Sequence, residues 1–121
     1  MTVVIVEDDP MMCRALSRAL RALETPLLIA GTVEGALEHI EQSGVHVLLT
    51  DFSLGEGEDI SQLLEKVRES HPRCEIFLMT GHDLPMIPLD RNLYDEYIQK
   101  PFSLRDLRGM IERSLRQASA S

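Results

Sequence analysis

Short apolar runs alternate along this chain with longer stretches whose apolar residues recur at helical spacing. The apolar runs have the length of β-strands and occupy residues 3–6, 27–30, 45–50, 74–79 and 97–99. The stretches with helical spacing occupy residues 10–23, 33–42, 59–70 and 104–115. Strands that alternate with helices are typical of a parallel sheet. The pattern therefore predicts an α/β domain with helices on both faces of one sheet.

Two of the predicted helices begin with residues that favour helix N-termini. Asp9 precedes Pro10, and Asp is a good N-cap while Pro fits the first turn of a helix. Ser103 precedes the last helix, and Asp106 follows it in a pattern that resembles a capping box. These signals support helices that begin close to residues 10 and 104.

The segment between residues 80 and 97 departs from the alternation. A helix is expected there, but Pro85 and Pro88 stand where its first two turns belong. A proline inside a helix costs about 3 kcal/mol, so we expect this fourth helix to be short or irregular. The apolar side chains of the segment either form a site for a partner or for self-association, or they fill the core; they are Leu84, Ile87 and Leu89.

Length and composition favour a single domain in the cytoplasm. The chain has 121 residues, and we assign residues 1–117 to the domain and residues 118–121 to a tail or the start of a linker. We expect no membrane-spanning helix and no signal peptide, because the apolar runs are too short. Cys13 and Cys74 are too few and too far apart for a disulfide scaffold or a zinc site.

The net charge of −8 argues against nucleic-acid binding by this domain, because that function needs a basic surface. Asp106 and Glu112 interrupt the one candidate basic stripe, so we interpret that stripe as a solvated helix face. It consists of Arg105, Arg108, Arg113 and Arg116.

Polar residues follow four of the predicted strands, at the point where each strand ends. Glu7 and Asp8 follow the first strand, and Asp51 follows the third. Thr80 follows the fourth strand and Lys100 the fifth. The carboxyl ends of parallel strands share one edge of a sheet, where ligands bind in open α/β folds. We therefore expect these side chains to converge.

Three carboxylates that converge would repel one another, and a hard cation resolves this repulsion. Mg²⁺ prefers carboxylate and carbonyl oxygens, so the cluster predicts a magnesium site. One carboxylate could then attack phosphorus and form an acyl phosphate. The ammonium group of Lys100 and the hydroxyl group of Thr80 would stabilise the charge on the phosphoryl oxygens.

With these residues in this order, the chain resembles the receiver domain of bacterial two-component response regulators over essentially its whole length. The resemblance implies a CheY-like, flavodoxin-like fold with a doubly wound five-stranded parallel sheet of order 2-1-3-4-5. It implies that Asp51 is the phospho-acceptor, that Asp8 binds Mg²⁺ directly, and that Glu7 acts largely through water. The backbone carbonyl group of Ser53 would be the third protein ligand.

The resemblance also implies roles for residues around this cluster. Thr80 would be the switch hydroxyl, Tyr97 the aromatic switch residue and Lys100 the lysine of the site. Residues 100–102, Lys-Pro-Phe, match a motif in which a cis peptide bond often precedes the proline. Ser53 and His82 occupy positions that tune the lifetime of the phosphoryl group; for His82, a solvated loop residue is the alternative.

The loop after Asp51 differs from the family pattern, which has a proline and an Asp-Gly pair there. Residues 54–60 are Leu-Gly-Glu-Gly-Glu-Asp-Ile, which makes the loop acidic and rich in glycine. The loop is either a tolerated variant, or it alters partner selection or access to Asp51.

The resemblance implies a phosphorylation switch rather than an enzyme with a separate substrate. Asp51 would receive a phosphoryl group from a histidine kinase or a phosphotransfer protein. The domain would catalyse only its own phosphorylation and dephosphorylation, and act on a downstream protein or a fused output domain. A homodimer through residues 80–97 and the last helix is a further expectation.

Two other functions stay open from the sequence. One is a pseudo-receiver that binds its partner without phosphorylation. The other is a phosphatase-type hydrolase, which needs a second Asp two positions after the nucleophile. Ser53 occupies that position.

Overall fold

Five parallel strands form a single sheet in the computed structural model, which describes residues 1–55, 57–81 and 87–120. The strands follow the order β2-β1-β3-β4-β5 across the sheet, so the predicted doubly wound fold is confirmed. Their bounds are β1 Val3–Val6, β2 Leu27–Ala30, β3 Val47–Asp51, β4 Glu75–Thr80 and β5 Glu96–Gln99.

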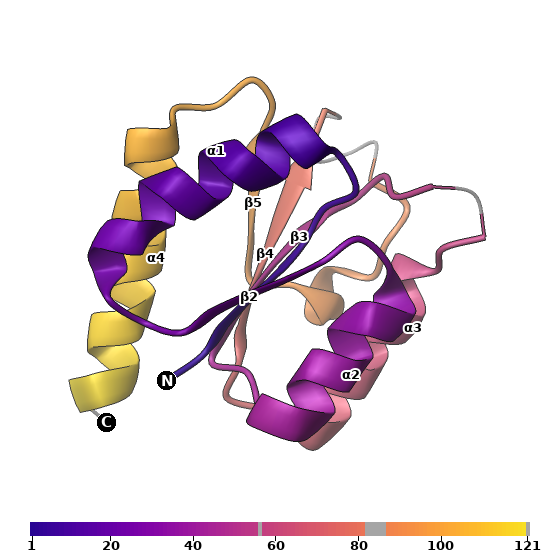
Figure 1. Ribbon diagram of the computed structural model, residues 1–121. Coiled ribbons are helices and arrows are strands. Elements are labelled where there is room, and N and C mark those ends of the chain that lie inside the picture. The colour runs from indigo at the N-terminus through magenta and orange to yellow at the C-terminus, as the bar shows by residue number, and fades with distance from the viewer. Residues whose placement is uncertain (56, 82–86, 121) are drawn as a thin grey trace.

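Helices cover both faces of this sheet (Figure 1). The α-helices of the described residues are α1 Pro10–Leu20, α2 Val33–Ser43, α3 Ile60–Ser70 and α4 Leu104–Ala120. Short 3-10 helices occupy Arg21–Leu23 (η1) and Arg91–Leu93 (η3). Helices α1 and α4 lie on one face, and α2 and α3 lie on the other. None of these helices combines the length and apolar character needed to cross a bilayer.

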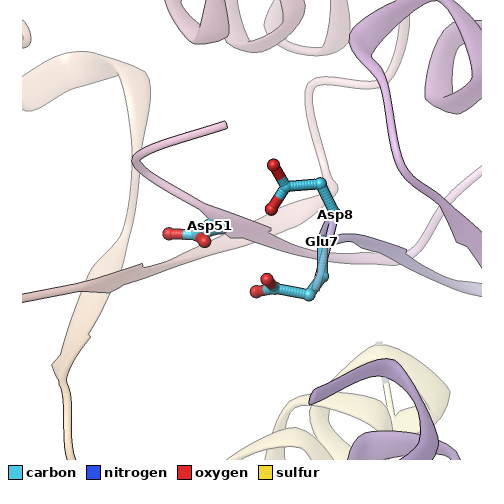
Figure 2. Close-up of side chains that lie close together, drawn as sticks. All are labelled: Glu7, Asp8 and Asp51. Atoms are coloured by element: carbon cyan, nitrogen blue, oxygen red, sulfur yellow. The ribbon is translucent and has the colours of Figure 1, made fainter. Parts of the chain in front are cut away.

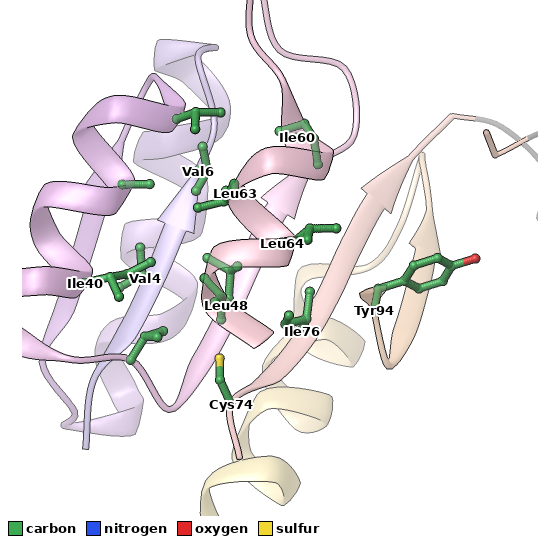
Figure 3. Close-up of a cluster of buried hydrophobic side chains, with 14 of the residues drawn as sticks. Val4, Val6, Ile40, Leu48, Ile60, Leu63, Leu64, Cys74, Ile76 and Tyr94 are labelled. Carbon is green, nitrogen blue, oxygen red and sulfur yellow. The ribbon is translucent and has the colours of Figure 1, made fainter. Parts of the chain in front are cut away.

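Each face of the sheet has its own hydrophobic core, because successive strand residues point to opposite sides. In β1, Val3 and Ile5 pack with α1 and α4, while Val4 and Val6 pack with α2 and α3. Figure 3 shows the second cluster, with Leu48 of β3 and residues of α2 and α3 around it. Burial on both faces explains why the central strands are continuously apolar.

The strand register aligns the carboxyl ends of four strands. Val6 of β1 pairs with Thr50 of β3, and Asp51 pairs with Met79 of β4. Thr80 pairs with Gln99 of β5. Residues 7, 51, 80 and 100 therefore lie at the same edge of the sheet, as the sequence predicts.

Several element boundaries differ from the sequence prediction. Asp51 is the last residue of β3 rather than the residue after it, and the strand begins at Val47. The first α-helix ends at Leu20 and continues as the short 3-10 helix η1. Glu24 caps η1 with a left-handed backbone (φ 54°). Helix α4 runs to Ala120, beyond the end of its apolar stripe. The domain boundary at residue 117 stays a prediction.

The described part of the segment between β4 and β5 is irregular, as the prolines predict. Only the short helix η3 forms among its described residues, and Leu84 and Pro85 lie outside them. Ile87 is buried and Leu89 is half-buried against the core of the α2 and α3 face. For these two residues the structure favours the core alternative over an exposed association site.

The guanidinium group of Arg68 on α3 holds this segment in place. Its Nε donates to the carbonyl oxygen of Asn92 at 3.2 Å, and its Nη1 donates to that of Cys74 at 3.2 Å. Its Nη2 lies 3.1 Å from a carboxylate oxygen of Asp95, which also accepts the backbone N–H of Ile76 at 2.7 Å. One side chain thus connects α3, β4 and the turn before β5.

We expect the Arg68→Ala substitution to lower the free energy of unfolding by about 2–3 kcal/mol, because two carbonyl groups and a carboxylate lose a charged donor. Urea unfolding followed by far-UV circular dichroism measures this change. The neighbouring exposed Lys66→Ala is the control and should stay within about 0.5 kcal/mol of the parent. Equal effects of the two substitutions would contradict the role of Arg68.

At the opposite edge of the sheet, His46 connects the amino ends of β1 and β3. Its Nδ1 accepts a hydrogen bond from the backbone N–H of Thr2 at 3.0 Å, so this nitrogen carries no proton. The backbone N–H of His46 donates to the carbonyl oxygen of Thr2 at 2.8 Å. Burial, and then the positive N-terminus and His71, lower the pKa of His46.

This lowered pKa predicts a loss of stability in acid. The unfolded chain binds the His46 proton more readily than the folded chain, so this contribution is present above pH 6.5 and is lost as pH falls through the lowered pKa. We expect His46→Gln to unfold with a smaller difference between about pH 7.5 and about pH 5.5 than the parent. The control His39→Asn should keep the difference of the parent in the same urea titrations.

Candidate functional site

Three carboxylates meet at the carboxyl edge of the sheet (Figure 2). Glu7 and Asp8 follow β1, and Asp51 ends β3. One oxygen from each carboxylate lies within 4.8 Å of the others. The sequence prediction that these residues converge is confirmed, because parallel pairing of β1 with β3 places their ends together.

Lys100 brings a positive charge to this cluster from the end of β5. Its Nζ lies 3.2 Å from Oδ2 of Asp51 and 3.8 Å from Oε2 of Glu7. The backbone N–H of Lys100 donates to the carbonyl oxygen of Thr80 at 2.7 Å, and the peptide bond between Lys100 and Pro101 is cis. The ammonium group therefore contacts the acidic cluster from the carboxyl end of β5, at the same edge of the sheet.

The carboxylate of Glu7 is buried in an electrostatically unfavourable environment. Its side chain is 2 % exposed, and its Oε2 has no hydrogen-bond donor among the described residues. Burial raises the pKa of Glu7, and the neighbouring charge of Asp51 raises it further. The backbone N–H of Asp9, which donates to Oε1 at 3.1 Å, and the charge of Lys100 act in the opposite direction. A second positive charge beside Oε2 would make this environment more favourable.

Asp51 is held in a fixed orientation by its own loop. The backbone N–H of Ser53 donates to Oδ1 at 3.1 Å, while Oδ2 faces Lys100. The N–H of Phe52 donates to the carbonyl oxygen of Met79 at 2.8 Å, which continues the ladder of β3 and β4 past the strand end. Both carboxylate oxygens of Asp51 therefore have a defined neighbour.

Asp8 differs from its two neighbours because it is exposed to solvent. A Cβ atom placed on Gly55 would lie 3.8 Å from Oδ2 of Asp8, so the acidic loop after β3 approaches this carboxylate. Leu54 of the same loop packs on the core of the α2 and α3 face. The loop is thus anchored beside the cluster, and both interpretations of its sequence stay predictions.

The other predicted site residues lie around this cluster. Thr80 ends β4 with 1 % of its surface exposed, and Tyr97 on β5 is half-buried against the core of the α2 and α3 face. Ser53 contributes its backbone N–H to Asp51, and the predicted role of its carbonyl group stays a prediction. His82 lies outside the described residues, so its role also stays a prediction.

Two supporting contacts were not predicted from the sequence. A carboxylate oxygen of Glu58 accepts the backbone N–H of Val33 at 2.7 Å, so the acidic loop caps the start of α2. The thiol group of Cys13 on α1 donates to the carbonyl oxygen of Glu7 at 3.2 Å. An acid at a helix N-terminus is a known stabilising pattern, but these partners are 25 residues apart and no local rule joins them.

The donor set fits a hard divalent cation. The cluster offers carboxylate oxygens, which Mg²⁺ prefers, and one buried oxygen of Glu7 has no hydrogen-bond donor within residues 1–55, 57–81 and 87–120. Asp8 is open to solvent, as suits an ion that keeps several water ligands. The arrangement can therefore hold Mg²⁺ between β1 and β3, beside the carboxylate that faces Lys100.

The chain is similar in sequence to curated proteins of bacteria. The chain is 32% identical over 118 residues to a cyclic di-GMP phosphodiesterase of Thermotoga maritima, with 96% of the chain and 31% of that protein covered. It is 29% identical over 121 residues to the transcriptional regulatory protein TrcR of Mycobacterium tuberculosis, with 93% and 46% covered. The chain spans less than half the length of both relatives.

Solved structures share the fold over nearly the whole chain. A CheY-like response regulator receiver domain from Methanospirillum hungatei superposes with a TM-score of 0.84 at 28% identity, covering 99% of this chain and 98% of that one. A two-component response regulator from Clostridium difficile has a TM-score of 0.85 at 23% identity, with 98% of each chain covered, and shows the fold alone.

The model of one protein family matches residues 3–112, which include the whole acidic cluster and Lys100. Its description is the response regulator receiver domain. The match covers most of the chain and agrees with the strand order and with the residues at the sheet edge. The chain therefore belongs to the response regulator receiver domain family.

Proposed function

We propose that this receiver domain accepts a phosphoryl group on Asp51 in a Mg²⁺-dependent reaction. The phosphoryl group would come from a histidine kinase or a phosphotransfer histidine. The observation that carries the proposal is the geometry around Asp51, whose Oδ2 lies 3.2 Å from the ammonium group of Lys100 while a second buried carboxylate and Asp8 lie beside it. The domain would act on no other substrate.

The residues of the site support each part of this reaction. An oxygen of Asp51 attacks phosphorus, the new bond is an acyl phosphate, and the imidazole of the donor leaves with the electron pair of the broken P–N bond. Lys100 is placed to stabilise negative charge on the transferred phosphoryl group, and Thr80 supplies a hydroxyl group from the neighbouring strand end. Bound Mg²⁺, held by Asp8 and Asp51 with Glu7 through water, would offset further negative charge.

We further propose that phosphorylation changes a protein-interaction surface, through Thr80 and Tyr97. Thr80 is buried at the end of β4, and the half-buried Tyr97 lies beside Leu78 in the adjacent strand. A phosphoryl group on Asp51 would attract the Thr80 hydroxyl group and shift the population of Tyr97 positions. The partner would be a downstream protein or a fused output domain, and a homodimer through residues 80–97 and α4 remains part of this proposal.

Intact-mass spectrometry after incubation with acetyl phosphate tests the phosphorylation step. We expect one phosphoryl adduct that requires Mg²⁺ and is lost in Asp51→Asn, which removes the nucleophilic oxygen. Asp106→Asn on the exposed surface of α4 is the matched control and should keep the adduct. A parent protein without any adduct would favour a pseudo-receiver that binds its partner without phosphorylation.

Thermal unfolding tests the metal site independently of phosphorylation. In chelator, Glu7→Gln should raise the melting temperature by about 3–6 °C, because it removes a buried charge worth roughly 1 kcal/mol. MgCl₂ should stabilise the parent and have a weaker effect on this variant.

The Asp8→Asn substitution tests metal binding without changing a buried charge. Asp8 is exposed, so its substitution should change the melting temperature little in chelator and still weaken the stabilisation by MgCl₂. Stabilisation by MgCl₂ that is equal in the parent and in both variants would contradict a metal site at the cluster.

A further inference from the structure

The two helical layers of this domain carry opposite charge. Helix α1 and η1 contain arginines at positions 14, 18 and 21 and no acidic residue. Helix α2 contains glutamates at positions 34, 38 and 41 and neither lysine nor arginine. We call the first set the arginine row and the second the glutamate row. Each row lies on one side of its helix, because its members are spaced by three or four residues.

Both rows are free to meet a partner. All six side chains are exposed, and no ion pair joins any of them to another residue in the described part of the chain. The rows cannot meet within one molecule, since α1 and α2 lie on opposite faces of the sheet (Figure 1). Two rows that are opposite in charge and equal in spacing, but lie on opposite faces of one molecule, suit contact between two molecules.

An apolar knob and an apolar groove accompany the rows. Met11, one turn before the arginine row, has 72% of its surface exposed. A groove of about 720 Å³ lies between the end of α2 and α3, with Leu37 and Ile40 among its lining residues and Glu41 at its rim. If α1 of one molecule lies antiparallel on α2 of another, Met11 reaches this groove while Arg14 faces Glu41.

The same antiparallel arrangement continues along both helices. Arg18 then lies opposite Glu38, and Arg21 lies opposite Glu34, because successive members of each row are about one helical turn apart. Arginine is the cation best suited to such contacts, because its planar fork binds carboxylates through two parallel hydrogen bonds.

We propose that α1 and α2 form a self-association surface, with a second copy of this chain as the partner. The contact joins α1 of one molecule to α2 of the other. A pair of molecules therefore still has one unoccupied arginine row and one unoccupied glutamate row. Such heterologous contacts build open chains of molecules unless they close into a ring. This surface differs from residues 80–97 and α4, and it needs no phosphorylation.

The association should be weak and sensitive to salt. One helix on another buries less than the roughly 1,200 Å² of a stable interface. The net charge of −8 repels at long range, but salt at about 0.1 M screens charges more than about 10 Å apart. We therefore expect the average mass of the full chain in sedimentation equilibrium to rise with concentration, without a plateau at the dimer, and to fall toward the monomer at about 500 mM salt.

Charge reversal of the rows provides the decisive test. A variant with Arg14→Glu, Arg18→Glu and Arg21→Glu should stay monomeric, because both of its rows are acidic. A variant with Glu34→Arg, Glu38→Arg and Glu41→Arg should also stay monomeric, because both of its rows are basic. An equimolar mixture of the two should associate again, and so should one chain that carries all six substitutions.

A matched control changes the same amount of charge on α4, in protein without a phosphodonor, so that the phosphorylation-dependent surface proposed above is not engaged. Under these conditions the variant with Arg105→Glu, Arg113→Glu and Arg116→Glu should associate as the parent does. Met11→Ala should weaken association about tenfold at constant charge. A monomeric parent at about 1 mM in about 0.1 M salt, or a mixture of the two reversed variants that stays monomeric there, would overturn the proposal. Loss of association in the α4 control alone would assign self-association to α4 instead.

Discussion

Two carboxylates lie at the edge of a buried sheet and share a single ammonium group. Glu7 and Asp51 are both almost fully shielded from water, and Lys100 lies within 4 Å of each. Such a group of charges is costly unless each member has a fixed partner. The parallel sheet meets this demand, because the register of its strands brings three distant parts of the chain to one edge. An excess of negative charge remains at this edge, because three carboxylates lie beside one ammonium group.

The fold and the centre of the site follow from patterns that act locally or through strand periodicity. Continuous apolar runs such as Val3–Val6 predict strands that are buried on both faces. The polar residue after each run then lies at the carboxyl edge of the sheet. The N-cap of α1 by Asp9 is equally local, since its side chain accepts the N–H of Met11 at 3.0 Å. The resemblance to a known family added the strand order and the roles of individual residues, which composition and spacing alone do not provide.

The contacts that the sequence did not predict join residues that are distant in the chain and are not related by helix or strand periodicity. Glu58 caps α2 from another loop, and Arg68 reaches the turn before β5 from α3. Pro85 and Pro88 predicted a short or irregular fourth helix, but they carry no information about the contacts of residues 87–95, such as those with Arg68. The extension of α4 to Ala120 is similar, because a solvated helical turn needs no apolar residue to form.

The turn before β5 is held by apolar packing and by one guanidinium group. Tyr94 is buried and Leu93 packs against the core of the α2 and α3 face. Three nitrogen atoms of Arg68 contact two carbonyl groups and a carboxylate around this turn. The ammonium group of a lysine is a single point of charge and does not reproduce this planar fork. A lysine at position 68 would therefore keep the charge but lose these paired contacts, although the position is partly exposed and lies away from the acidic cluster.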